Sequence, residues 1–278
     1  MPAPATSPAR SVSACDGTLP VVTFDGLLLD IDGVLAVSWE PLPGSVEALT
    51  SLREDAVPFR LITNTTTKTR ADLASTLRQA GFDVADEEIV TAVVATAEHL
   101  RTAHPGAKVY VLSDGDATAD LTGIDLVDVD DAEVIVIGGA NDEFTYSTMN
   151  GIFRRVMDGA ALVGMHRNLF WKTAEGWELD GGAYLAGLEE AADVRAVICG
   201  KPEKTYFDAG LAMLGITADQ AAMVGDDVVN DIVGAQSAGL TGVLVRTGKY
   251  RPGDEERDDP PDHVLESFAD VPDFLRSA

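Results

Sequence analysis

The chain has 278 residues, 46% of them hydrophobic, and its 20 basic and 46 acidic residues leave a formal net charge of −26. This composition is typical of a globular protein with one large domain or two smaller ones, and it excludes a disordered or fibrous chain. The negative charge opposes binding to nucleic acid and to anionic membranes, so neither is expected as a partner. A phosphorylated substrate would also be repelled, so a site for one needs a metal ion, a lysine or backbone amides nearby.

The chain carries no pattern of a secreted, disulfide-bonded or membrane protein. Cys15 and Cys199 are too few for a disulfide framework or a zinc site. Residues 1–17 are rich in Pro, Ala and Ser without an apolar stretch, and we expect a flexible leader there rather than a secretion signal. The apolar stretch 27–37 contains two aspartates and is too short to span a bilayer. A cytoplasmic, reducing location is therefore expected.

The first part of the chain alternates short apolar runs with amphipathic helices. The run 27–29 precedes a predicted helix over 44–54, and the run 59–62 precedes a helix that begins near Lys68 and ends at Gly81. This alternation is typical of a parallel sheet with helices on its faces, so we predict an α/β fold with a doubly wound, Rossmann-like core.

The middle of the chain, residues 83–195, repeats the alternation separately from the first part. Its predicted strands cover 109–112, 134–137 and 161–163, and its predicted helices cover 92–100 and 145–157. A hairpin-like segment follows at 170–179, with Gly176 in the turn. The length is sufficient for an independent α/β domain inserted into the core, which then comprises 18–82 and 196–278.

The last part returns to the pattern of the first. A helix is predicted over 205–214 with Gly215 at its end, and strands are predicted at 221–224 and 242–245. Between these two strands, Val229, Ile232 and Val233 indicate a further helix. These elements complete the same sheet as the first part.

The strongest chemical signal is LLLDIDGVL at residues 27–35, where two carboxylates interrupt an apolar strand. Burying Asp30 and Asp32 without a partner would cost several kcal/mol, a cost that a bound cation offsets. Mg²⁺ prefers such oxygen ligands, and Gly33 permits a sharp bend directly after Asp32. A strand that ends in a polar, solvated turn is the competing interpretation.

Two further polar segments follow apolar runs. In FRLITNTT, residues 59–66, Thr63 and Asn64 supply donors suited to phosphoryl oxygens, although a turn or helix cap is the better explanation of this segment taken alone. In GKPEKTYF, residues 200–207, Lys201 can neutralise carboxylates and bind phosphate as a point charge. Taken alone, it reads as an exposed loop lysine.

The fourth segment, AAMVGDDVVNDIVGAQSAG at residues 221–239, places Asp226 directly after a strand and Asp231 on the next turn. Asp226 is suited to bind a metal, and Asp231 to bind it through water or to orient the other ligands. Helix capping is the alternative for this segment. All four segments follow predicted strands, and because the carboxyl ends of parallel strands meet at one crevice, we expect the four to form a single site.

The order DxDGV, T-N, GKP and GDDxxxxD resembles that of the haloacid dehalogenase superfamily, and an α/β insert between the second and third motifs is similar to its class IIA, or NagD-like, members. GKPEKTYF, GDDVVNDIVGAQSAG and VRTGKYRPGDEE resemble the branch of phospholysine phosphohistidine inorganic pyrophosphate phosphatase. The similarity extends from about residue 26 to the C-terminus. It implies a hydrolase with a Mg²⁺ cofactor, a small phosphorylated substrate and an inserted C2-type cap domain.

The resemblance also implies roles for single residues. Asp30 would be the nucleophile that forms an aspartyl-phosphate, and Asp32 the general acid and base. Thr63, Asn64 and Lys201 would bind phosphate. Asp30, the backbone carbonyl of Asp32 and Asp226 would hold Mg²⁺, while direct ligation by Asp231 stays open. Some relatives in the branch carry Ser at the position of Asp32, and the carboxylate here predicts phosphate ester hydrolysis.

Substrate choice is expected to lie in the insert, which would close over the crevice. In MHRNLFWKT, residues 165–173, His166, Arg167 and Asn168 are the candidates, although they also fit an ordinary strand of the insert. A pyrophosphatase or phosphoamidase and a non-catalytic, phosphate-responsive module remain alternatives. The resemblance further implies a homodimer that pairs through the insert.

Overall fold

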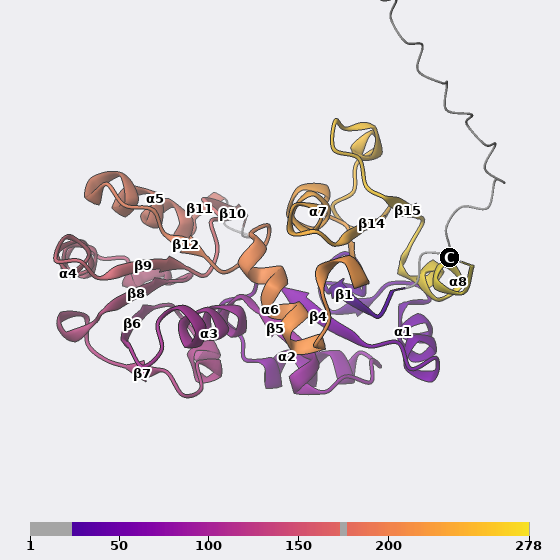
Figure 1. Cartoon of the computed structure of the whole chain (residues 1–278), viewed down its shortest axis with the longest axis horizontal. Coiled ribbons are helices and arrows are strands. Elements are labelled where there is room, and N and C mark those ends of the chain that lie inside the picture. Colours follow the sequence, from indigo (N-terminus) through magenta and orange to yellow (C-terminus); the bar gives the residue numbers. More distant parts are fainter. Residues whose placement is uncertain (1–23, 173–176, 278) are drawn as a thin grey trace, which may run out of the picture.

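A computed structural model of the chain describes residues 24–172 and 177–277. The predicted leader and the predicted turn at Gly176 lie outside these residues. Two lobes lie side by side, each built around a parallel sheet with helices on both faces (Figure 1). This architecture confirms the predicted α/β fold, a doubly wound core with a second α/β unit inserted into it. No helix in the described part of the chain combines the length and apolar content that a membrane span requires.

The first sheet contains six strands in the order β15-β14-β13-β1-β4-β5, and neighbouring strands are parallel. Its strands are β1 (Gly26–Asp30), β4 (Phe59–Thr63), β5 (Ile89–Thr91), β13 (Ala221–Gly225), β14 (Thr241–Val245) and β15 (His263–Leu265). Every residue of β1 is buried. Because both faces of this strand are covered, its sequence is continuously apolar from Gly26 to Leu29 rather than alternating.

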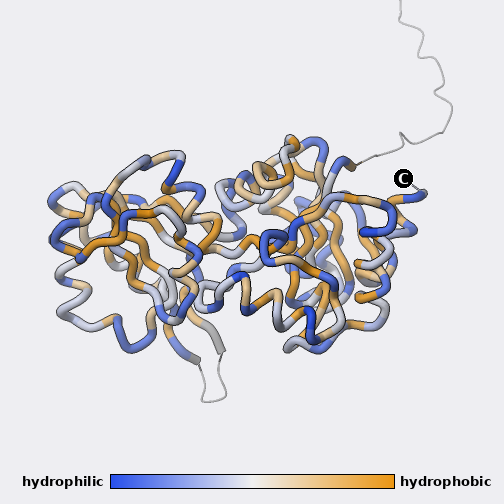
Figure 2. Tube along the Cα trace, turned by 90° about the horizontal axis from the view of Figure 1, so that it is seen from below, coloured by the Kyte–Doolittle hydropathy of each residue, from blue (hydrophilic) through white to orange (hydrophobic). Residues whose placement is uncertain are grey.

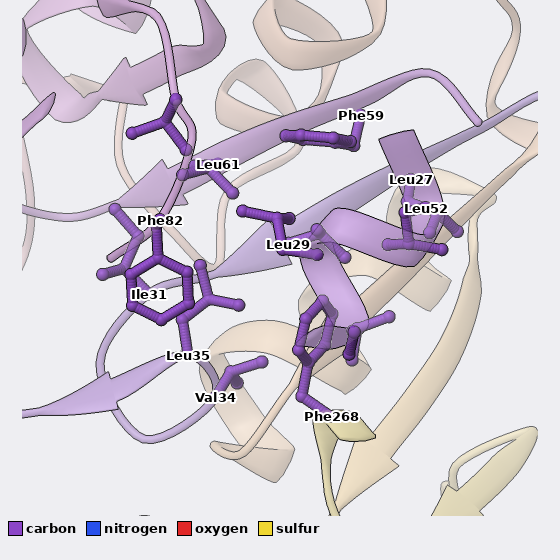
Figure 3. Close-up of a cluster of buried hydrophobic side chains, with 14 of the residues drawn as sticks. Leu27, Leu29, Ile31, Val34, Leu35, Leu52, Phe59, Leu61, Phe82 and Phe268 are labelled. Atoms are coloured by element: carbon purple, nitrogen blue, oxygen red, sulfur yellow. The ribbon is translucent and has the colours of Figure 1, made fainter. Parts of the chain in front are cut away.

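Helices cover both faces of the first sheet. On one face lie α1 (Ser45–Glu54), α2 (Arg70–Gln79) and α8 (Val271–Ser277), and on the other lie α6 (Lys204–Leu214) and α7 (Gly234–Ala238). Leu27 and Leu29 of β1 pack toward the first face, whereas Leu28 packs toward the second, as the two-residue repeat of a strand requires. Figure 3 shows the first cluster, in which Leu27 and Leu29 of β1 lie among the side chains of Leu52 and Phe82.

The second sheet contains five parallel strands in the order β12-β9-β8-β6-β7. These are β6 (Lys108–Leu112), β7 (Asp125–Leu126), β8 (Val134–Ile137), β9 (Ala161–Gly164) and β12 (Val197–Ile198). Helix α3 (Ala92–Ala103) covers one face, and α4 (Tyr146–Met157) and α5 (Gly181–Ala192) cover the other. Strands β10 (Phe170–Lys172) and β11 (Trp177–Leu179) pair antiparallel beside this sheet. Apolar chain segments run through the interior of each lobe (Figure 2).

Helix α3 joins the two lobes, because its side chains enter the hydrophobic cores of both. Val94 and Ala95 pack in the core of the first lobe, and Val93 and Leu100 pack in that of the second. The strands on either side of the insert locate its ends: β5 pairs with β4 in the first sheet, and β12 pairs with β9 in the second. We therefore propose that the inserted domain comprises residues 92–199, later at both ends than the expected 83–195.

Two elements differ from expectation for local reasons. Helix α5 was not predicted, because it begins with Gly181 and Gly182, and glycines usually interrupt helices. The Asp180 side chain caps the start of this helix by accepting a hydrogen bond from the Gly181 N–H. The predicted helix after Asp227 begins with a wider, π-helical turn over Val228–Val233 and continues as α7. A small hairpin, β2 (Ala36–Val37) and β3 (Glu40–Pro41), follows β1.

Candidate active site

Three of the four polar segments meet because their strands are neighbours in the first sheet. Asp30 is the last residue of β1, Thr63 is the last residue of β4, and Asp226 directly follows β13. Since β13, β1 and β4 are adjacent and parallel, their carboxyl ends lie at the same edge. The sequence prediction for these three segments follows directly from the sheet order.

Lys201 reaches the same edge by a different route from the predicted one. The strand before it, β12, belongs to the second sheet, so Lys201 does not extend a strand of the core. The chain crosses back to the core at Gly200, and the side chain of Asn64 holds it there. The Lys201 N–H donates to Asn64 Oδ1 at 2.8 Å, and Asn64 Nδ2 donates to the Lys201 carbonyl at 3.0 Å. Asn64 therefore fixes the backbone of Lys201.

The Lys201 ammonium lies between two buried carboxylates. Its Nζ is 2.7 Å from Asp30 Oδ1 and 2.7 Å from Asp231 Oδ1. Asp30, Asp226 and Asp231 each offer a carboxylate oxygen, and these oxygens lie within 4.8 Å of one another. Asp231 is thus a full member of the cluster. The side chain of Asp32 is exposed instead and is not part of this group of carboxylates.

The cluster carries more negative than positive charge in a buried setting. Burial raises the pKa of Asp226 and of Asp231 to about 6, and it also raises the pKa of Asp30 against the opposing effect of Lys201. Burial alone would lower the pKa of Lys201, but Asp231 and Asp30 outweigh it and raise that pKa above its ordinary value. One ammonium among three carboxylates leaves an uncompensated charge that a bound cation would balance.

The carboxylate of Asp226 has one oxygen bound by the protein and one left over. Oδ2 accepts a hydrogen bond from the Lys249 N–H at 2.6 Å, whereas Oδ1 is buried and has no hydrogen-bond partner among the described residues. Gly33 and Gly248 surround Oδ2 so closely that a Cβ on either would lie 2.0 or 1.9 Å from it. An unpartnered buried carboxylate oxygen beside two other carboxylates fits a hard divalent cation such as Mg²⁺.

A cavity of about 570 Å³ opens above this cluster. Asp30, Asp32, Thr63 and Lys201 line it from the first domain, and Asn168 lines it from the insert. The cavity therefore lies between the two domains, and its size suits a small organic molecule.

Comparison with known proteins agrees with this geometry. A sequence profile described as haloacid dehalogenase-like hydrolase matches residues 27–127, and a related HAD-hydrolase-like profile matches residues 198–271. Haloacid dehalogenase-like hydrolase domain-containing protein 2 of Rattus norvegicus is 38% identical over 90% of this chain and 95% of its own length. The chain belongs to the haloacid dehalogenase superfamily. Phospholysine phosphohistidine inorganic pyrophosphate phosphatase of Homo sapiens is 34% identical over 90% of this chain and 93% of its own.

Solved structures place this haloacid dehalogenase-like chain with the class IIA phosphatases. The p-nitrophenyl phosphatase from Archaeoglobus fulgidus superposes with a TM-score of 0.83 at 28% identity, covering 91% of this chain and all of its own. NagD from E. coli K-12 superposes with a TM-score of 0.81 at 27% identity, covering 89% of this chain and 98% of its own. The predicted superfamily and class are thereby confirmed.

The three specificity candidates of this class IIA chain point in different directions. Asn168 lines the cavity. Arg167 binds Glu189 of α5 through two hydrogen bonds of 2.7 and 3.0 Å. His166 is buried, with its Nε2 3.5 Å from Asp180 Oδ1 and its Nδ1 accepting a hydrogen bond from the Asn168 N–H. Burial lowers the pKa of His166. Of the three, only Asn168 is among the residues that line the cavity.

Several cavity residues of this chain escaped the sequence analysis. Lys249 lies in the loop after β14, which ends at Val245, and a loop at the carboxyl end of a core strand was a usable signal. Tyr206 does not line the cavity but was also missed: fully buried, it holds the end of β4, because its hydroxyl accepts a hydrogen bond from the Thr63 N–H and donates one to the Thr63 carbonyl. Ser38 and Trp39 of the β2–β3 turn also line the cavity. No sequence pattern distinguishes these two from an ordinary turn.

Proposed function

We propose that this protein is a Mg²⁺-dependent phosphohydrolase that moves the phosphoryl group of a small phosphorylated metabolite to Asp30 and then to water. The observation that supports this most strongly is the position of the Lys201 ammonium, 2.7 Å from both Asp30 and Asp231 at the floor of an open cavity. A buried lysine so placed can hold the nucleophile in one rotamer and attract a phosphoryl oxygen at the same time.

The carboxylates of Asp30, Asp226 and Asp231, with the backbone carbonyl of Asp32, would hold the metal ion. When bound, Mg²⁺ would neutralise part of the phosphate charge and favour the approach of the anionic nucleophile. The unpartnered Oδ1 of Asp226 supports this assignment, as does the excess of buried negative charge. The glycine pair at Gly33 and Gly248 would keep the Asp226 carboxylate in one orientation for the ion.

In the first step, a carboxylate oxygen of Asp30 attacks phosphorus, and the bond from phosphorus to the leaving oxygen breaks. Asp32, exposed in the cavity, gives its proton to that oxygen. In the second step, Asp32 takes a proton from water as the water oxygen attacks phosphorus, and inorganic phosphate leaves with Asp30 restored. The Thr63 hydroxyl and Lys201 bind the phosphoryl oxygens, and Asn64 acts through Lys201 as a positioning residue.

Cleavage of a P–N or P–O–P bond is the second candidate, favoured by the 34% identity to phospholysine phosphohistidine inorganic pyrophosphate phosphatase. The same nucleophile and lysine would serve it. Parallel assays with pyrophosphate, phosphoramidate and a panel of sugar and nucleotide monophosphates distinguish the two. The carboxylate of Asp32 supports phosphate ester hydrolysis over the second candidate, because an alcohol is a poor leaving group unless it receives a proton.

The experiment measures phosphate release from this panel by metal-stripped protein with and without added Mg²⁺. We expect release only with the metal, and a loss of about 10³-fold or more in Asp30→Asn. Asp25→Asn, a substitution of an exposed aspartate just before β1, is the matched control and should retain full activity. Acid quenching during turnover should trap a phosphoryl group on Asp30. Activity without a divalent cation, or in Asp30→Asn, would contradict the proposal, and a stable phosphorylated protein without turnover would favour the non-catalytic module.

A further inference from the structure

The turn between β2 and β3 has an unusual residue choice. This two-residue turn consists of Ser38 and Trp39, and both have positive φ angles, 50° and 68°. Turns of this kind favour Asn and Gly, because a side chain at positive φ crowds the backbone. A large aromatic residue is therefore unfavourable for the hairpin alone. A strained residue beside a functional cavity is a reason to look for a role in that cavity.

Trp39 lines the same cavity as Asp30 and Asp32, and 38% of its surface remains exposed. The other residues that line the cavity in the described part of the chain are polar or small, apart from Ile31, which is almost fully buried. Trp39 is thus the one broad apolar surface that these residues offer to a substrate. It stands on the element that directly follows the Asp30–Asp32 segment, so it is well placed to meet the leaving group.

A lysine holds the indole ring from one side. Lys68, which lies just before α2, places its Nζ 4.7 Å from the centre of the Trp39 ring, a distance typical of a cation–π contact. Lys68 does not itself line the cavity. This ammonium covers one face of the ring, and Trp39 still lines the cavity with 38% of its surface exposed, which leaves surface that a second planar group can contact. Offset stacking of two rings contributes more than the burial of apolar area alone.

We infer that Trp39 is a specificity-determining residue that stacks on a planar ring in the leaving group of the substrate, with Lys68 as the residue that positions the indole. The inference rests on the proposed phosphohydrolase function and deepens it. The substrate class is a phosphate monoester of an alcohol that carries an aromatic or heteroaromatic ring. The cavity of about 570 Å³ accommodates one such molecule together with its phosphate.

The test uses two esters that differ only in the ring: benzyl phosphate, with a planar ring, and cyclohexylmethyl phosphate, with a puckered one. Both release a primary alcohol, so the chemical step is closely matched. We expect the wild-type kcat/KM to favour benzyl phosphate. Trp39→Leu, which keeps apolar bulk without a ring, should lower this preference by about 3- to 10-fold, and Trp39→Phe should retain most of it.

Lys68 is tested through the same ratio of kcat/KM values. Lys68→Met should lower the preference for benzyl phosphate by about 2-fold, and Lys68→Arg should restore it, because only the cation is needed over the ring. A purely structural role of Lys68 would change the melting temperature and leave the ratio untouched. If Trp39→Leu does not fold, Trp39→Phe and the two Lys68 variants still test the stacking.

The outcomes separate this inference from the function on which it rests. If wild type hydrolyses both esters equally well, or if Trp39→Leu changes both alike, the stacking role is wrong and the phosphohydrolase stands. If wild-type protein with Mg²⁺ hydrolyses neither these esters nor the metabolite panel, both proposals fail. Hydrolysis of both esters that is lost in Asp30→Asn shows that the function itself holds.

Discussion

Replacing Asp32 with asparagine would remove an acid from the cavity with little change in shape. The Asp32 side chain is exposed and makes no hydrogen bond or ion pair with the other described residues. The substitution therefore breaks no structural contact, and we expect the free energy of unfolding to change by no more than about 0.5 kcal/mol. The same is not true of Asp30, which is buried against Lys201.

The expected effect on turnover is much larger than the effect on stability. General acid–base catalysis contributes about 10²- to 10⁴-fold, which corresponds to about 3 to 5 kcal/mol of the barrier. The loss should depend on the leaving group, because a poor leaving group needs a proton and a good one does not. Asp32→Asn should thus lose more activity on an alkyl phosphate than on 4-nitrophenyl phosphate in single-turnover measurements of the first step.

The measurements are the single-turnover rate of the first step and kcat/KM for both esters, together with the melting temperature and its rise on adding Mg²⁺. The melting temperature and the Mg²⁺ response should match those of wild type. A loss below about 10-fold on the alkyl ester would refute the acid–base assignment. An equal loss on both esters would show that Asp32 acts in another way, for example by placing the substrate.

Four other predictions concern the metal site and the insert. Mg²⁺ at about 100 times its Kd should stabilise metal-stripped protein by about 2.7 kcal/mol, seen as a higher melting temperature; no change would count against the metal site. Gly248→Ala places a Cβ 1.9 Å from Asp226 Oδ2, so it should weaken Mg²⁺ binding and lower the free energy of unfolding by about 1 to 3 kcal/mol. The control is Gly253→Ala: Gly253 also has a positive φ but has open space around it, so Mg²⁺ binding should stay unchanged. Arg167→Ala should lower the free energy of unfolding by about 2 kcal/mol. This is less than the loss expected when a fully buried ion pair is broken, because the Arg167 guanidinium is partly exposed. The kcat of this variant should stay within about 2-fold of wild type. Hydrogen bonding to Arg167 lowers the pKa of Glu189, so the pair stabilises the fold at pH values above the ordinary glutamate pKa of 4.5. The difference in unfolding free energy between wild type and Glu189→Gln should therefore shrink as the pH falls below 4.5. A difference that stays constant with pH in urea denaturation would contradict this.

The sequence alone was sufficient to predict the centre of the fold and most of the carboxylate cluster. The runs 27–29 and 221–224 are continuously apolar because β1 and β13 are buried on both faces, whereas the run 59–62 of β4 is interrupted by the half-buried Arg60. Helical periodicity between such runs predicts a parallel sheet, and a parallel sheet brings the ends of its strands to one edge. The proximity of Asp30 and Asp226 follows from this local information.

Only the tertiary structure decided features that depend on contacts between distant residues. Strands β5 and β12 have three and two residues, too few for a local pattern, so the sheet to which each belongs is set by its neighbours. Arg167 turns away from the cavity because Glu189, 22 positions later, accepts its two hydrogen bonds. Trp39 lines the cavity from a turn whose two residues have positive φ, a backbone conformation that its sequence does not predict. A side chain's direction depends on which partner the folded chain brings near it, and spacing along the sequence does not record that partner.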